Sequence, residues 1–228
     1  MTDTVQGIIS DSGFVLYDDS HGKRANHEAV CRQFEIGYEA FVERLGPYRR
    51  RAQRDPAYSG EDALRDLSRE LGIDANEVLA VRRSLKRPRV LRDGVRETLG
   101  ELKHRGTPLV ILSDTYRTAG ELREKYRTDL GLVDMVTAFI TSKDMELRKP
   151  DPGMYEAAFR EVAAALGGPA PAHSAVAFLG HDLDELEGAH ACGLRTLAVY
   201  YRGAREEISF ISDRDILSGF AGLLDILD

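Results

Sequence analysis

Five short apolar runs, separated by helical patterns, constrain the fold of this chain more than any other feature. The first covers residues 7–10 and ends at Asp11, and the second covers residues 109–112 and ends at Ser113. The other three cover residues 136–141, 175–179 and 196–201. Runs that are apolar at nearly every position, rather than at every second one, indicate strands with both faces buried, as in a parallel sheet.

Helical patterns alternate with these runs over residues 93–104, 119–126, 152–166 and 183–192. Asp151 and Pro152 begin the third pattern in the manner of an N-cap followed by a proline at the first helical position. The alternation predicts an α/β fold with a doubly wound, Rossmann-like parallel sheet. In such sheets ligands bind outside the carboxyl ends of the strands, so Asp11, Ser113 and residues 180–185 are expected to converge.

The segment from residue 20 to residue 87 interrupts this alternation and has no convincing strand. Its apolar spacing predicts one helix over residues 25–45. Ser59 and Asp74 each precede an acidic residue by three positions, which is typical of a helix start. We therefore expect a core formed by residues 1–19 and 88–228 and a small all-helical cap formed by residues 20–87.

Charge and composition limit the kinds of molecule that the chain is expected to bind. The 228-residue chain has a formal net charge of −7, so no overall positive field attracts nucleic acid or an anionic membrane. Its apolar runs are too short to span a bilayer, its first residues are polar, and its two cysteines are far apart. We expect a cytoplasmic monomer or homodimer that acts on a small molecule.

Four segments, taken in order, carry a resemblance to a known family. They are Asp11-Ser12-Gly13, then Ser113-Asp114, then Lys149-Pro150-Asp151-Pro152 with Tyr155, and finally Gly180-His181 followed by Gly188-Ala189. In this order and spacing they resemble the haloacid dehalogenase-like hydrolase superfamily, in the branch whose cap follows the first core strand. The third segment is the most specific of the four.

The resemblance implies a role for several of these residues. Asp11 would be the nucleophile, and Lys149 would clamp its charge. Ser113 and the backbone N–H of Asp114 would bind a phosphoryl oxygen. A Mg²⁺ ion would be held by Asp11, the carbonyl of Gly13, Asp182 and Glu185. The expected reaction is hydrolysis of a small, possibly anionic, phosphate ester.

Two positions depart from the family pattern. Gly13 stands where phosphatases of the family have a second aspartate, which serves as their general acid and base. His181 stands at the first acidic site of the fourth segment, where an imidazole suits Mg²⁺ less well than a carboxylate. His181 is either a general base or a structural residue.

These departures leave two alternatives open. One is a 2-haloacid dehalogenase-type or other non-phosphatase hydrolase, since a halide leaves without a proton. The other is a catalytically impaired member that binds a ligand or a partner protein. A basic run in the cap, with Arg49, Arg50, Arg51 and Arg54, is either a solvated surface or a contact for an anionic substrate.

Overall fold

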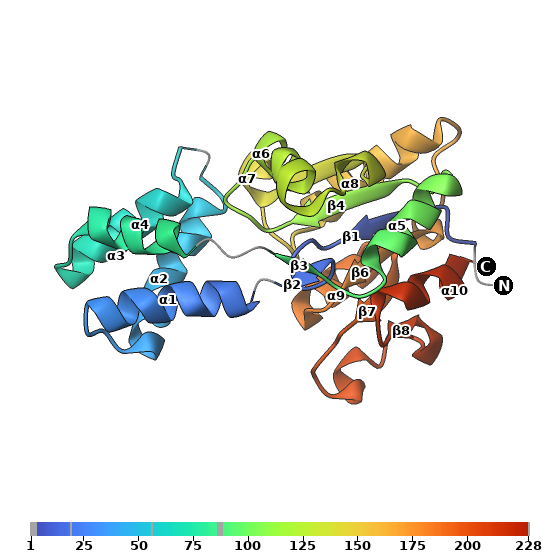
Figure 1. Cartoon of the computed structure of the whole chain (residues 1–228). Coiled ribbons are helices and arrows are strands. Elements are labelled where there is room, and N and C mark those ends of the chain that lie inside the picture. The colour runs from blue at the N-terminus through green and yellow to red at the C-terminus, as the bar shows by residue number, and fades with distance from the viewer. Residues whose placement is uncertain (1–3, 19, 56, 86–88, 228) are drawn as a thin grey trace.

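The computed structural model describes residues 4–18, 20–55, 57–85 and 89–227. Its centre is a six-stranded sheet in the order β5-β4-β1-β6-β7-β8 (Figure 1). Every neighbouring pair is parallel. The strands are β1 (Gly7–Ser10), β4 (Leu109–Ser113), β5 (Ala138–Thr141), β6 (Val176–Gly180), β7 (Arg195–Val199) and β8 (Ile216–Leu217). The predicted doubly wound parallel sheet is confirmed.

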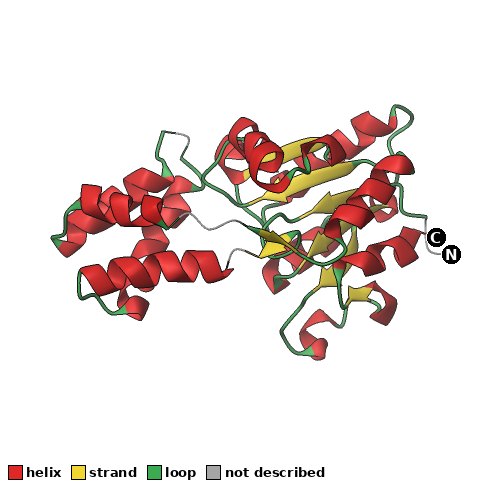
Figure 2. Cartoon of the chain, in the orientation of Figure 1, coloured by secondary structure: helices red, strands yellow, loops and turns green. Residues whose placement is uncertain are grey.

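Helices cover both faces of the sheet (Figure 2). One face packs on α5 (Val95–His104), α6 (Ala119–Lys125) and α10 (Leu223–Leu227), and the other on α8 (Pro152–Leu166) and α9 (Leu183–Ala191). Neighbouring residues Ile8 and Ile9 of β1 belong to these two different apolar clusters, and both are fully buried. Burial on both faces explains why the strands read as continuous apolar runs.

Shorter elements complete the core. They are α7 (Ser142–Met145), a π-helical turn at Tyr126–Leu130, and 3-10 turns at Val133–Met135, His173–Ala175, Arg205–Ile208, Asp213–Asp215 and Phe220–Gly222. The predicted start of α8 is confirmed, because the Asp151 side chain accepts a hydrogen bond from the N–H of Gly153 at 2.9 Å. The predicted end of β7 was wrong: the strand stops at Val199, because Tyr200 adopts a φ of 53°.

Four helices lie to one side of the sheet (Figure 1). They are α1 (Ser20–Gln33), α2 (Tyr38–Ala52), α3 (Gly60–Leu71) and α4 (Ala75–Ser84). They share an apolar cluster of their own that includes Val30, Phe41 and Leu67. Ser59 and Asp74 cap α3 and α4 as predicted. No described helix is long and apolar enough to cross a membrane.

The predicted single helix over residues 25–45 was wrong. The chain leaves the helix after Gln33, Glu35 adopts a φ of 52°, and a new helix begins after Gly37. The apolar spacing runs through the break because α1 and α2 bury side chains in the same cluster. Sequence periodicity alone therefore does not separate the two helices.

β2 (Tyr17–Asp18) pairs antiparallel with β3 (Val90–Leu91) in a small sheet that sequence analysis did not predict. The proposed boundaries at residue 19 and at residues 87 and 88 lie outside the described residues. The division into core and cap therefore stays a prediction.

Candidate active site

A buried lysine stands at the centre of the site. The Nζ atom of Lys149 donates to Asp11 Oδ1 at 2.6 Å, to Glu185 Oε2 at 2.8 Å and to the carbonyl of Leu112 at 3.3 Å. Its side chain is fully buried. Three acceptors match the three N–H donors of an ammonium group. The ends of β1, β4 and β6 meet here, as predicted from the strand-end residues.

The charged groups in this cluster shift one another's pKa values. Burial alone would lower the pKa of Lys149, but Asp11, Glu185 and Asp114 raise it above its usual value. Burial raises the pKa of Glu185 to about 8 against the opposing effect of Lys149, and Asp11 adds to the rise. Two carboxylates therefore share one ammonium group, and burial favours the protonated form of Glu185.

Close packing places Lys149 and Glu185 together. Helix α9, which carries Glu185, approaches Pro150 so closely that a Cβ atom on Gly188 would lie 2.6 Å from the Pro150 Cβ. Only glycine permits this approach. The hydroxyl of Tyr155 then donates to the Glu185 carbonyl at 2.8 Å. The Lys-Pro-Asp-Pro-x-x-Tyr segment thus positions both partners of the charge cluster.

Asp114 supports the same loop rather than facing the centre. Its Oδ1 atom accepts from the backbone N–H of Lys149 at 3.2 Å, and its Oδ2 atom lies 3.3 Å from Arg148 Nε. Burial raises the pKa of Asp114, although Lys149 and Arg148 oppose the shift. Ser113 is buried at the end of β4 beside it. Both predicted substrate-binding residues therefore lie at the carboxyl edge, and their roles stay predictions.

The second carboxylate oxygen of Asp11 faces a histidine. His181 Nδ1 lies 3.7 Å from Asp11 Oδ2, which is too long for a direct hydrogen bond. Within the part of the chain that the structure describes, this buried Nδ1 atom has no hydrogen-bond partner. A buried imidazole nitrogen without a partner, beside a carboxylate oxygen, is a feature that calls for a functional explanation.

Phe14 packs against His181, and Arg92 in turn contacts Phe14. Sequence analysis predicted neither contact. The Phe14 ring stacks on the imidazole with centroids 5.1 Å apart and an interplanar angle of 11°. Phe14 itself has a φ of 69°, a strained conformation for a residue with a side chain. Arg92 Nε donates to the Phe14 carbonyl at 2.9 Å, and its guanidinium lies 5.0 Å from the Phe14 ring centroid. No local sequence pattern predicts this arrangement.

A cavity of about 340 Å³ opens beside this stack. Phe14 and His181 form one wall, and Tyr200 and Arg202 from the loop after β7 form another. The Arg202 guanidinium lies 5.2 Å from the Phe14 ring centroid. The cavity gives a small molecule room next to the imidazole, although Asp11 does not line it.

The proposed ligands fit Mg²⁺ poorly. Among the residues that the structure describes, no three His, Cys, Asp or Glu side chains gather to hold a metal ion. The Glu185 carboxylate is bonded to Lys149, and the Asp182 side chain is 70% exposed. Asp11 Oδ2 lies 3.7 Å from His181 Nδ1, and Asp182 Oδ2 lies 4.0 Å from His181 Nε2. The magnesium expectation stays a prediction.

Gly13 leaves space where an acid would stand. A Cβ atom built on Gly13 would meet no atom within 4 Å. No neighbouring side chain therefore fills that position. The site has a held carboxylate and an ammonium group, but no acidic side chain at position 13.

Comparison with known proteins finds a matching family and solved structures with a similar fold. A family model described as haloacid dehalogenase-like hydrolase matches residues 6–193. No curated protein sequence matches the chain. Among solved structures, a 2-haloacid dehalogenase from Pseudomonas syringae pv. Tomato DC3000 is 19% identical, with 98% of each chain covered and a TM-score of 0.64. A predicted phosphoglycolate phosphatase from Haemophilus somnus 129pt is 13% identical, with 98% of each chain covered and a TM-score of 0.66. At these identities the likeness shows the fold alone.

Proposed function

The chain belongs to the haloacid dehalogenase-like hydrolases, and from this premise we propose that it hydrolyses a carbon–halogen bond of a small molecule with Asp11 as the nucleophile. One observation carries the proposal: Lys149 holds the Asp11 carboxylate at 2.6 Å, but position 13 is a glycine and supplies no acid. A halide leaves carbon without a proton, whereas the alkoxide leaving group of a phosphate ester needs an acid.

The charge balance supports the same choice. Lys149 is shared by Asp11 and Glu185, and Asp114 adds a third acidic side chain nearby. A phosphate monoester would bring two further negative charges to this cluster. A neutral carbon centre avoids that repulsion. Phosphate-ester hydrolysis, which the sequence favoured, therefore becomes the competing hypothesis.

The proposed reaction has two steps. In the first, Asp11 Oδ2 attacks the carbon, a carbon–oxygen bond forms, and the halide leaves with the electron pair of the broken bond. In the second, water attacks the carboxyl carbon of the resulting ester. The ester divides into an alcohol and the Asp11 carboxylate, and one proton is released. The Lys149 ammonium group stabilises the negative charge that develops on the Asp11 oxygens.

His181 is the base proposed for the second step. Its Nδ1 atom lies 3.7 Å from Asp11 Oδ2, so a water molecule that attacks the ester would pass beside it. Imidazole is the most frequent general base in enzymes. The stack on Phe14 holds the ring in this orientation. We propose that His181 takes the proton from the attacking water.

The helical segment is the proposed cap. Residues 20–87 would enclose the substrate against the core of residues 1–19 and 88–228. Lys143 joins the two parts, since its Nζ atom donates to the backbone carbonyls of Asp55 and of Tyr58, the latter at 2.9 Å. A covered site excludes water from the displacement step.

We expect the protein to release halide from small brominated or chlorinated substrates and to release no phosphate from an aryl phosphate, with or without Mg²⁺. The physical reason is the missing acid at position 13, which costs a phosphatase roughly 10²–10⁴-fold in rate. The measurement is halide by ion chromatography and phosphate by a colorimetric assay. Magnesium-dependent phosphate release without halide release would favour the competing hypothesis. No release in either assay would favour a binding or regulatory protein.

His181→Gln is expected to slow turnover by about 100-fold or more, because the second step loses its base. The first step needs no base, so the Asp11 ester should accumulate. Mass spectrometry of the variant after mixing with substrate measures the added mass on the peptide that contains Asp11.

The matched control is His190→Gln, which changes an exposed histidine on α9. It should turn over substrate at the wild-type rate without accumulation. If His181→Gln is slow and no ester is detected, the histidine does not act in the second step.

A further inference from the structure

The cavity beside the stacked Phe14 and His181 rings has the size and the walls of a ligand site of its own. Its volume is about 340 Å³, and Tyr200 and Tyr201, which follow β7, add two further rings to its lining. Cavities that bind small molecules range from about 300 to 1,000 Å³ and combine apolar or aromatic walls with a few polar groups. Asp11 does not line the cavity, so the proposed displacement does not take place in it.

Two of the four rings are carried by strained backbone. Phe14 has a φ of 69° and Tyr200 has a φ of 53°. Among the described residues other than glycine, only Glu35 and Glu146 share this conformation. Such residues are held by their surroundings and cluster at ligand sites. Tyr200 is held in part by its hydroxyl, which accepts from the backbone N–H of Phe220 at 3.2 Å. The strain at both ring-bearing positions favours a binding role for the cavity that they share.

Arg92 fixes these two rings relative to each other. Its guanidinium lies 5.0 Å from the Phe14 centroid and 4.5 Å from the Tyr200 centroid. Its Nε atom donates to the Phe14 carbonyl at 2.9 Å, and its Nη2 atom lies 3.7 Å from Asp18 Oδ2. Walls that are already in place before a ligand arrives lower the entropic cost of binding.

Arg202 supplies a positive charge to the cavity. Its guanidinium lies 5.2 Å from the Phe14 centroid, so it is placed over the ring wall. Arg202 is exposed and forms no ion pair with a carboxylate of the described residues. A guanidinium group binds a carboxylate through two parallel hydrogen bonds. Its position therefore suits a carboxylate whose attached group packs on the rings.

Asp182 limits where that carboxylate can lie. The Asp182 side chain also lines the cavity, and its Oδ2 atom lies 4.0 Å from His181 Nε2. Two negative charges repel each other, so a ligand carboxylate is directed away from Asp182 and toward Arg202. The uncharged part of the ligand is then left among the rings.

We propose that this cavity binds a small aromatic carboxylate, with its ring among Phe14, Tyr200 and Tyr201 and its carboxylate at Arg202. An aromatic ring is favoured over an alkyl group because pairs of aromatic rings attract each other beyond the effect of buried area. The site does not depend on the proposed halide release, because Asp11 is not part of it.

The test is calorimetric titration of wild type with three probes at constant ionic strength: benzoate, cyclohexanecarboxylate and benzyl alcohol. The second probe keeps the charge without the aromatic ring, and the third keeps the ring without the charge. We expect benzoate to bind about 2- to 10-fold more tightly than cyclohexanecarboxylate. We expect it to bind about 10-fold more tightly than benzyl alcohol, because the alcohol loses a charge-assisted hydrogen bond.

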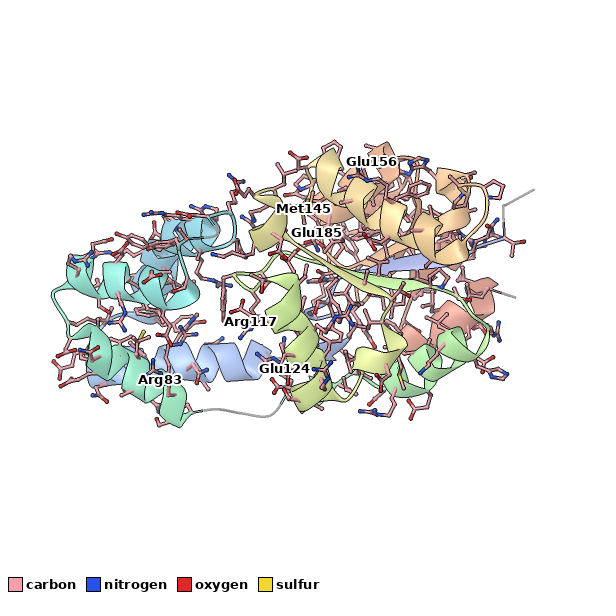
Figure 3. All side chains as sticks on the ribbon, turned by 90° about the horizontal axis from the view of Figure 1, so that it is seen from above. Arg83, Arg117, Glu124, Met145, Glu156 and Glu185 are labelled. Carbon is pink, nitrogen blue, oxygen red and sulfur yellow. The ribbon has the colours of Figure 1, made fainter. Side chains whose placement is uncertain are left out.

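Two variants test the two parts of the cavity. Arg202→Gln should weaken benzoate binding by about 10-fold and leave benzyl alcohol binding unchanged. Tyr200→Leu should reduce the preference for benzoate over cyclohexanecarboxylate. The control is Arg160→Gln, which changes an exposed arginine on α8 whose Nε atom donates to the Glu156 carbonyl at 3.3 Å. Figure 3 shows Glu156 at the outer edge of the core, and the control should bind benzoate as wild type does.

Failure of wild type to bind benzoate overturns the site. Equal binding of benzoate by wild type and Arg202→Gln overturns it as well, because the carboxylate then lies elsewhere. If Tyr200→Leu does not fold, Arg202→Gln, which changes an exposed loop residue, decides alone. Absence of halide release from wild type, with benzoate binding intact, would overturn only the proposed reaction.

Inhibition of halide release by benzoate separates two sources of the ligand. Competitive inhibition indicates that the aromatic carboxylate is part of the substrate. Non-competitive inhibition indicates a separate molecule that regulates the enzyme from the cavity beside His181.

Discussion

Asp11→Asn is expected to lower kcat/KM for halide release by about 10⁴-fold or more, because removal of a covalent nucleophile typically has effects of this size or larger. The amide oxygen of asparagine is neutral and a poor nucleophile. The geometry around it should change little, since Lys149 keeps its hydrogen bonds to Glu185 and to the Leu112 carbonyl. Halide release under second-order conditions measures the effect.

The control is Asp184→Asn, the same change at an exposed position on α9. It should leave kcat/KM within about twofold, because surface substitutions have small effects. Thermal melting of both variants verifies that they fold. If Asp11→Asn retained activity within tenfold of wild type, a group other than Asp11 would have to make the covalent bond.

The central part of the fold was predictable because strands that are buried on both faces are apolar at nearly every position. Strands β1, β4 and β6 are buried at every position, so each reads as a short apolar run. The residues that end these runs then lie at one edge of the sheet. Because ligands bind at this edge in such sheets, the sequence predicts that Asp11, Ser113 and the Gly180 region converge.

Elements that depend on single backbone angles were not predictable. The break between α1 and α2 occurs at Glu35, a residue with no special preference for a positive φ. Strands β2 and β3 have two residues each, which is too few for a periodic pattern to form. At these positions tertiary contacts, rather than local sequence propensity, determine the backbone conformation.

The candidate site likewise has one part that the sequence predicted and one part that it did not. The motif around Lys149 indicated a charge clamp, and the structure brings that lysine within 2.6 Å of Asp11. The stack of Phe14 on His181 depends on a left-handed φ and on Arg92, which is 78 residues away in sequence. A single sequence contains no signal for such a distant pairing. The environment of His181 therefore emerged only from the structure.

Lys149→Met is expected to lower the free energy of unfolding by about 3–5 kcal/mol at pH 8, because removing one partner of a buried ion pair leaves uncompensated charge. Methionine fills a similar volume, but Asp11 and Glu185 lose their shared cation. Urea denaturation of wild type and variant measures the difference.

The same difference should shrink at pH 5. Burial raises the pKa of folded Glu185 to about 8 from a reference value of 4.5, so the folded state retains a proton that the unfolded state releases. A raised pKa of this kind contributes stability below the unfolded value, and that contribution is lost as pH rises through the folded value. Without Lys149, which opposes the rise, the variant should lose stability over a wider pH range than wild type.

Lys143→Met is the matched control for this pH dependence. Lys143 is also buried, but its Nζ atom donates to the backbone carbonyls of Asp55 and Tyr58, which do not titrate. Its loss should cost about 1–3 kcal/mol, the usual penalty for unsatisfied buried acceptors, at both pH values. If Lys149→Met showed an equally flat profile, Glu185 would not be the proton-binding group of the cluster. Contacts other than the one to Lys149 would then have to stabilise the buried Glu185 carboxylate.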